Sequence, residues 1–336
     1  MTISTVIAAS NFFAPTESYS SSQVESLLAK VYDELRLPYG RLEELTGVNT
    51  RGCYPTSLSP GEIAALSAKE LLQQNDLSDV DVLIYCGVCR DALEPSTSSQ
   101  VHKILNLNAS CLHFDLSNAC LGMINAVQVA HHLLQNESFN RVLVVTGENP
   151  KPMLEKLVER LNNTEINRQS IKEHIASLTL GGASFSLLVS KEKLYPTATK
   201  ILGFHWKTDT DGFDLCRASG DYWAPQMRTD SEKLLNAGIK LGKDLWSTWC
   251  EQKKVKLNYY VTHQVGKAHA TAIEKELGLK SLKTWHSYPT YGNTGTAAVP
   301  LTWHLAKMRG DISSEMQGVW MGIGSGLNAM LIHVQG

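Results

Sequence analysis

The chain has 336 residues, of which 43% are hydrophobic and 19% are charged, and its formal net charge is −2. This composition is that of a globular protein with material for a substantial core. The small net charge and the lack of a Lys- or Arg-rich run exclude an evident nucleic-acid-binding surface, and no stretch approaches the ~20 apolar residues that span a bilayer.

The N-terminal segment and the cysteines indicate the compartment. No Lys or Arg precedes Lys30, and the apolar stretch there is too short for a secretory signal. The seven cysteines are scattered and odd in number, which is typical of free thiols in a reducing compartment. We therefore expect a cytoplasmic protein with neither a membrane nor a nucleic acid as partner.

Apolar strands alternate with helices in the first half of the chain. Ser59-Pro60-Gly61-Glu62 predicts the start of a helix that continues to Leu72. Residues 151–178 are more polar and helical in pattern, and we interpret them as an insertion or lid. Strands are predicted at 82–88, 113–117, 141–147 and 184–190.

A second series follows after a loop-like region at 204–230. Helices are predicted at about 231–252, 267–277 and 293–307. Strands are predicted at 258–263, 284–288, 318–323 and 328–334.

The two series can be laid over each other strand by strand. Strands that alternate with helices predict mostly parallel sheets, so we expect two similar α/β halves, 1–190 and 191–336. Cys120, His263, Asn293 and the loop that carries Glu94 then all fall at carboxyl ends of strands, where such sheets place their sites.

Cys120 stands where the strand HFDLS gives way to an apolar-periodic helix. The unpaired N–H groups at the start of a helix favour a thiolate, so this cysteine is a candidate nucleophile. A single cysteine is more often a buried structural residue, and the pattern by itself leaves both interpretations open.

Four motifs resolve this choice through a resemblance that covers almost the whole chain. SNACLG (117–122), THQVGK (262–267), YGNTGTA (291–297) and GIGSGLNAM (322–330) resemble the thiolase-fold condensing enzymes, in particular the ketoacyl synthase III branch. The resemblance implies a thiolase fold, with duplicated α/β halves in a layered αβαβα arrangement. It also implies that Cys120 is the acylated nucleophile. Leu45 stands where the family often has an arginine, which puts any role for that arginine in doubt.

The stretch CRDALEPST (89–97) narrows the resemblance. It is similar to the head-to-head acyl-thioester condensing enzymes of olefin biosynthesis and to pyrone-forming relatives. In that subgroup a glutamate in this loop is supplied across a dimer interface, and Glu94 occupies its place. A carboxylate in an apolar pocket suits a base that removes an α-proton. A solvent-exposed, idle loop acid is the alternative.

The resemblance therefore implies a homodimeric acyltransferase that joins two acyl thioesters by non-decarboxylative Claisen condensation. His263 and Asn293 would hydrogen-bond the enolate oxygen, while backbone N–H groups at Cys120 and 322–326 would form a second oxyanion hole. The substrate is acyl-CoA or an acyl carrier protein thioester, and the product is a 3-oxoacyl thioester, a 3-oxo acid or a pyrone.

Two rival functions remain open. Decarboxylative condensation with malonyl carrier protein is the first, although Val265-Gly266 departs from the Ala-Asn of that group. A non-catalytic partner subunit is the second, although it predicts loss of one of the three motif residues. No cofactor or metal is expected, because Cys86 and Cys89 have no second pair at zinc-site spacing.

Overall fold

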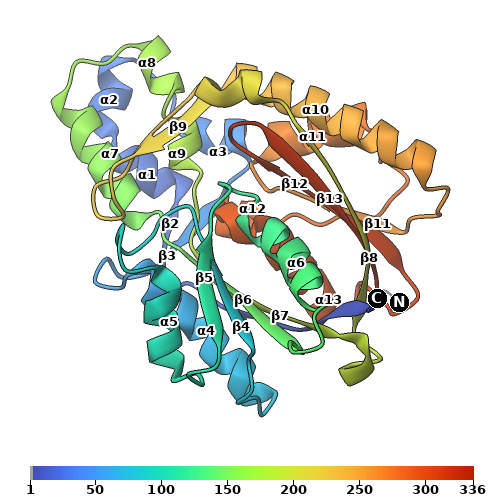
Figure 1. Ribbon diagram of the computed structural model, residues 1–336. Coiled ribbons are helices and arrows are strands. Elements are labelled where there is room, and N and C mark those ends of the chain that lie inside the picture. The colour runs from blue at the N-terminus through green and yellow to red at the C-terminus, as the bar shows by residue number, and fades with distance from the viewer. Residues whose placement is uncertain (1–2) are drawn as a thin grey trace.

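The computed structural model describes residues 3–336 and is built around a mixed sheet (Figure 1). Nine strands follow one another in the order β11-β12-β13-β8-β1-β7-β6-β4-β5. In chain order they are β1 Thr5–Phe13, β4 Val82–Cys86, β5 Leu112–Leu116, β6 Arg141–Glu148, β7 Ala183–Lys191, β8 Thr199–Thr208, β11 Tyr259–Thr262, β12 Gln317–Gly324 and β13 Asn328–Gln335.

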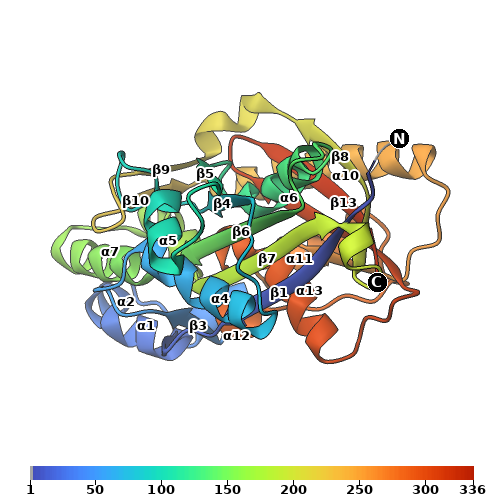
Figure 2. The same ribbon diagram turned by 60° about the horizontal axis from the view of Figure 1, so that its bottom comes forward.

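Helices cover both outer faces of this sheet and also lie between its two halves (Figures 1 and 2). The inner layer is α6 (Gly122–Leu133) with α13 (Ala298–Met308), and both helices contribute to the largest buried cluster. The outer helices are α4 Pro60–Gln74 and α5 Thr97–Leu105 on one side and α10 Ser231–Gln252 and α11 Lys267–Glu276 on the other. The expected layered α/β fold is confirmed.

The strand directions differ from the expected mostly parallel sheet. Only β4 with β5, β4 with β6, and β11 with β12 are parallel among the described strands of this sheet, whereas the other pairs are antiparallel. The antiparallel pairs arise because the chain re-enters the sheet at the same end at which the preceding strand left it. β7 begins opposite the end of β6, with Ala183 beside Glu148, and a tight turn at Gly324 to Asn328 sends β13 back along β12.

Two sequence predictions of local structure are wrong. No strand forms at 284–288. Only Lys283, just before this segment, bridges to Tyr259, and the chain then enters the short helix α12 (Tyr288–Tyr291), which has Pro289 in its first turn. The region 204–230 is not a plain loop, because β8 continues to Thr208 beside β13 and a two-stranded sheet follows.

The remaining elements are mostly short. They are β2 Glu17–Ser20, α1 Ser21–Leu27, α2 Ala29–Glu34, α3 Arg41–Thr46, β3 Thr50–Cys53, α7 Lys151–Asn163, α8 Arg168–Lys172, α9 Ile175–Leu178, η1 Glu192–Leu194, η2 Thr210–Leu215, β9 Cys216–Ser219, β10 Gln226–Thr229 and η3 Gly295–Ala297. The segment 151–178 is helical as expected, and its leucines pack against α1, α2 and α3 in a separate apolar cluster. No helix within residues 3–336 has the length and apolarity to cross a membrane.

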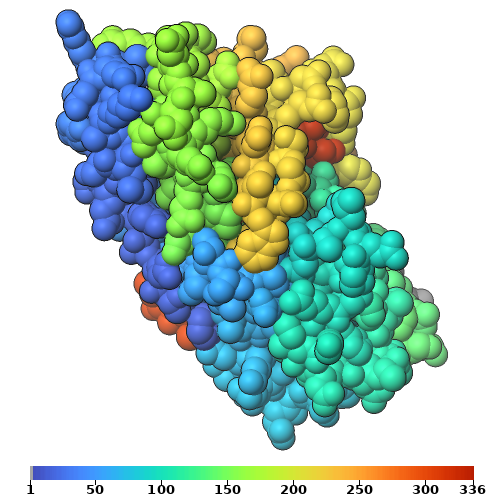
Figure 3. Space-filling model, turned by 90° about the vertical axis from the view of Figure 1, so that its left-hand side faces the viewer, coloured from blue at the N-terminus to red at the C-terminus, as the bar shows by residue number. Residues whose placement is uncertain are grey.

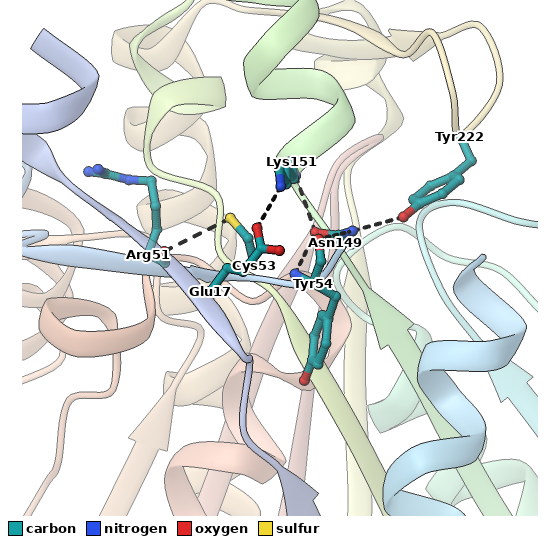
Figure 4. A network of polar contacts seen from close by, with 7 residues as sticks. All are labelled: Glu17, Arg51, Cys53, Tyr54, Asn149, Lys151 and Tyr222. Atoms are coloured by element: carbon teal, nitrogen blue, oxygen red, sulfur yellow. Dashed lines mark hydrogen bonds and ion pairs between the residues drawn. The ribbon is translucent and has the colours of Figure 1, made fainter. Parts of the chain in front are cut away.

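A polar network fixes the first turn of α7 in place (Figure 4). Lys151 forms an ion pair with Glu17 of β2 at 2.5 Å. Asn149 accepts a hydrogen bond from the Tyr54 N–H at 3.1 Å, and its own amide group donates to the Tyr222 hydroxyl at 2.9 Å. The two-stranded sheet of β2 and β3, the β6–α7 junction and the loop before β10 are thereby held together.

Candidate active site

Cys120 lies in a tight junction between β5 and α6. Ala119 adopts the left-handed region at φ +45°, which costs energy for a residue with a Cβ and turns the chain sharply. The helix then begins at Gly122, where a Cβ would lie 3.1 Å from the Thr296 methyl group. The glycine therefore lets the cysteine junction press against the loop that follows Asn293.

His263 and Asn293 are held by backbone hydrogen bonds. His263 comes directly after β11, and its N–H donates to the Met321 carbonyl of β12 at 2.9 Å. The Asn293 N–H donates to the Thr179 carbonyl at 2.8 Å, and its carbonyl accepts from the Gly181 N–H at 2.8 Å. Both side chains are more than nine-tenths buried, so their backbones set where they point.

The three predicted residues come together in one cavity of about 160 Å³. Cys120, His263 and Asn293 all line it. Its other walls are Ala176, Leu180, Cys216, Met227, Thr229, Ser231, Leu234, Leu235, Gly238, Val265, His269, Ile323, Gly324, Ser325 and Leu327. Most of these side chains are apolar, and no Asp or Glu of the described chain is among the lining residues.

The side chain of Asn293 is oriented by one further contact. Its Oδ1 accepts a hydrogen bond from the Gly295 N–H at 3.1 Å. Because the oxygen is occupied in this way, the Nδ2 group is the part of the amide that remains as a donor for a ligand in the cavity.

Burial sets the charge states in the cavity. It lowers the pKa of His263 to about 3, with His269 adding to the effect, and it lowers the pKa of His269 to about 4. Both imidazoles are therefore neutral at physiological pH and able to donate one N–H each. Their ring centroids are 6.4 Å apart.

The helix start beside Cys120 does not lower the pKa of its thiol. Burial, together with the charges of Glu148 and Cys216, raises that pKa to about 12. The desolvation of the thiolate outweighs the favourable end of α6, which begins only two residues later. The raised pKa favours a protonated thiol at neutral pH, and the role of Cys120 as the nucleophile stays a prediction.

The glycine-rich turn at 322–326 approaches the same junction. Gly324 and Ser325 line the cavity, and a Cβ at Gly324 would lie 3.0 Å from the Asn118 carbonyl. The Asn328 side chain also donates to Asn118 Oδ1 at 3.4 Å. The backbone of this turn therefore passes directly beside the cysteine, where the sequence predicts a second oxyanion hole.

Glu94 does not lie in the cavity of its own subunit. It is exposed on the loop between β4 and α5, next to Leu93, which is 92% exposed. Cys86 is buried within β4, and burial raises the pKa of both Cys86 and Cys89. No group of three or more potential metal ligands occurs within residues 3–336.

Three residues near the site escape the sequence prediction. His269 lies on the first turn of α11, and Cys216 lies within the region 204–230 that was predicted to be loop-like, so neither carries a motif signal. Glu148 ends β6 and lies close enough to affect the charge of Cys120. Glu148 directly follows RVLVVTG at the carboxyl end of a predicted strand, and this position is a signal from which the sequence could have indicated it.

A cysteine, a histidine and an asparagine that share one cavity in a layered α/β fold define a condensing enzyme of the acyl-transferring class. Profile comparison matches residues 114–210 to 3-oxoacyl-[acyl-carrier-protein] synthase III and residues 251–334 to the C-terminal part of the same family. The chain is 30% identical over 323 residues to the acyl-CoA:acyl-CoA alkyltransferase of Xanthomonas campestris, with 94% of each protein covered. The chain therefore belongs to the ketoacyl synthase III-like condensing enzymes of the thiolase superfamily.

Other relatives and solved structures agree. The acyl-CoA:acyl-CoA alkyltransferase of Shewanella oneidensis is 27% identical, with 94% of each chain covered. A beta-ketoacyl-[acyl-carrier-protein] synthase III of Clostridium botulinum is 27% identical, with 83% of this chain and 86% of the relative covered. Cerulenin-bound OleA of Xanthomonas campestris superposes with a TM-score of 0.94 at 28% identity, covering 99% of this chain and 97% of that one. A cysteine-to-serine OleA variant with bound lauric acid and lauroyl-CoA gives a TM-score of 0.93 at 27% identity, with both chains fully covered.

Proposed function

We propose that this protein joins two acyl thioesters by non-decarboxylative Claisen condensation through an acyl-Cys120 intermediate. The observation that carries the proposal is the shared cavity, in which one nucleophile and two neutral hydrogen-bond donors face an apolar interior. The similarity to acyl-CoA:acyl-CoA alkyltransferases supports acyl-CoA as the thioester.

In the first half-reaction Cys120 attacks the acyl thioester. The sulfur–carbon bond to the protein forms, the bond to the carrier sulfur breaks, and the carrier thiol leaves with the proton that the Cys120 thiol gives up. Backbone N–H groups at Cys120 and in the 322–326 turn would stabilise the oxyanion, since Gly324 and Ser325 lie along the same cavity wall.

In the second half-reaction an enolate of the second thioester attacks the acyl-enzyme. The new carbon–carbon bond forms as the bond between the acyl carbon and the Cys120 sulfur breaks, and the sulfur takes up the proton that the base removed. The neutral His263 and the amide group of Asn293 are suited to donate to the enolate oxygen. Neutral donors stabilise that charge without protonating the carbanion, and removing one such donor typically costs ~10²–10³ in rate.

A base must remove the α-proton of the second thioester, and we propose Glu94 of a second subunit. The cavity itself has no lining Asp or Glu, so within the described chain an acid has to come from elsewhere. Glu94 is exposed and is therefore available to another copy. β5 is an edge strand, and such an edge favours pairing with a second copy. It packs beside α5, on the face that Figure 3 shows with α7 and the β9–β10 hairpin.

Subunit mixing tests whether Glu94 acts in a homodimer. Cys120→Ala and Glu94→Gln homodimers are each expected to be inactive. A random mixture contains heterodimers in which one site has both Cys120 and Glu94, so about a quarter of the parent activity should return. No recovery, in a mixture shown to exchange subunits, would contradict a base supplied across the interface.

Decarboxylative condensation with a malonyl carrier protein is the alternative function, and the similarity to beta-ketoacyl synthase III supports it. The two functions differ in whether a malonyl thioester is needed. With acyl-CoA as the only thioester substrate, the product should contain both acyl chains. Glu94→Gln should abolish formation of this product while Cys120 still becomes acylated. Product that forms only when malonyl carrier protein is added would favour the alternative.

We further propose that the chain is organised as two halves, 1–190 with the nucleophile and 191–336 with His263 and Asn293. No cofactor beyond the acyl thioesters is needed for the proposed chemistry. The free state of all seven cysteines supports a cytoplasmic location.

A further inference from the structure

Glu148 is a buried carboxyl group, and the proposed mechanism assigns it no role. Its side chain ends β6 and is 8% exposed. One oxygen, Oε1, accepts hydrogen bonds from the Val88 N–H at 3.3 Å, the Thr296 N–H at 3.4 Å and the Thr296 hydroxyl at 3.2 Å. Among the residues that the structure describes, no Lys, Arg or His forms an ion pair with it.

The carboxyl group of Glu148 lies between the loop that follows Asn293 and the junction that carries Cys120. A Cβ at Gly295 would come within 2.9 Å of its Oε1, so the backbone of Gly295 packs directly on the carboxyl group. The same Gly295 donates its N–H to Asn293 Oδ1, and the Thr296 methyl group packs against Gly122 at the start of α6. Glu148 therefore contacts the loop that orients Asn293, and that loop contacts the helix that follows Cys120.

The groups whose pKa values are affected by the charge of Glu148 are all acids. They are Tyr85 and Cys86 of β4, Cys89 of the following loop, and Cys120. Burial is the main reason why the pKa of each is raised, and the charge of Glu148 raises each further. Burial also raises the pKa of Glu148 itself, whereas its hydrogen bonds from Val88 and Thr296 lower that pKa. In its charged form the carboxylate opposes a second negative charge on the Cys120 sulfur.

We propose that Glu148 is a positioning residue of the condensation site, which clamps the Asn293 loop to the Cys120 junction and places a carboxylate near the Cys120 sulfur. The inference rests on the proposed acylation of Cys120. To attack a thioester, the Cys120 thiol gives up its proton, which leaves with the carrier as a thiol, and the sulfur forms the bond to the acyl carbon while the carrier sulfur–carbon bond breaks. The sulfur is neutral both as the resting thiol and as the acyl thioester, so the Glu148 carboxylate opposes only the transient thiolate.

Alkylation of Cys120 by iodoacetamide tests the electrostatic part without any acyl substrate. The rate is followed by the mass of the peptide that contains Cys120, between about pH 7 and 9, where the pH stays below the raised pKa of the thiol. Glu148→Gln should lower the pKa of Cys120. Each unit of that fall increases the thiolate about ten-fold and reduces its intrinsic reactivity about three-fold, so alkylation should be faster by about three-fold per unit at each pH.

Glu25→Gln is the matched control. Glu25 is also a buried carboxylate that accepts from two backbone N–H groups and one hydroxyl, but it lies in α1 and does not affect the charge of Cys120. It should leave the alkylation rate of Cys120 unchanged. An unchanged rate in a folded Glu148→Gln protein, or an equal increase in the Glu25 control, would overturn the electrostatic role.

Glu148→Asp separates the clamp from the charge, and it carries the test if the Gln variant does not fold. The shorter side chain keeps the charge but cannot reach Thr296 and Val88 together, so kcat for condensation should fall while the alkylation rate stays near that of the parent. Condensation at the parent rate would overturn the clamp. Faster alkylation in this variant would overturn the role of the charge. Alkylation of Cys120 needs no thioester, so the alkylation rates can still be interpreted if the proposed condensation does not occur.

Discussion

Replacing Asn293 by Asp changes one atom and tests the assigned donor most sharply. Backbone hydrogen bonds to Thr179 and Gly181 hold the residue, and the new carboxylate can still accept from the Gly295 N–H at the position of Oδ1. The loop should therefore stay in place. What changes is the Nδ2 group, which becomes an oxygen without a proton.

The expected magnitude follows from this loss. One missing oxyanion donor costs about 2.7–4 kcal/mol, or ~10²–10³ in kcat, and a negative charge beside an enolate adds to that loss. Acylation of Cys120 should be nearly unchanged, because we assign its oxyanion to the backbone N–H groups at Cys120 and in the 322–326 turn. As the pH falls and the new carboxyl group takes up a proton, it regains a donor, so the ratio of variant to parent condensation should rise.

The assay separates the two half-reactions. Intact mass after mixing with one acyl-CoA reports the acyl-enzyme, and product formation reports condensation. Asn75→Asp, a change of the same charge at an exposed position after α4, is the control and should behave as the parent. Parent-like condensation by the Asn293 variant, or an equal loss of acylation and condensation, would refute the assignment of Asn293 to the enolate.

Three further predictions concern the base, the packing and the pH dependence. Glu94→Gln should retain acylation and unfolding temperature, since the side chain is exposed, and should lose ~10²–10⁴ in condensation; an unchanged condensation rate would contradict its role as a base. Gly181→Ala should lower stability by about 3 kcal/mol or more in thermal unfolding, because its Cβ would lie 1.6 Å from the Tyr291 carbonyl; a parent-like unfolding temperature would contradict this. Because His263 and His269 have lowered pKa values in the folded state, only the unfolded chain binds their protons below about pH 6.5, and each should reduce stability by about 1.4 kcal/mol per pH unit down to about pH 4; constant stability in chemical denaturation between these limits would show that they titrate normally.

The sequence contained most of what positions the site. Cys120, His263 and Asn293 each stand at the end of an apolar run or next to a glycine turn, so their motifs predict both the chemistry and the place in the fold. The apolar strands of the first half were predicted within a few residues, because runs such as VLIY and RVLVV are buried on both faces.

The remaining features depend on tertiary contacts that no local pattern encodes. β7 runs antiparallel to β6 because the helices α7 to α9 return the chain to the same end of the sheet. The protonated state of Cys120 depends on burial and on Glu148, which comes 28 residues later in the sequence. Likewise, the exposure of Glu94 is a property of the fold, and its proposed role as a base requires a second subunit.

Supplying the protein with two acyl-CoAs of different length, and no malonyl compound, is the most direct test of the central claim. Intact mass should show an acyl group on Cys120, absent from Cys120→Ala, and the product should contain the carbons of both acyl chains. One molecule of coenzyme A is released for each condensation, and a second follows only where the product thioester is hydrolysed to the 3-oxo acid. An acyl-enzyme that stays unchanged until a malonyl thioester is added would contradict the account.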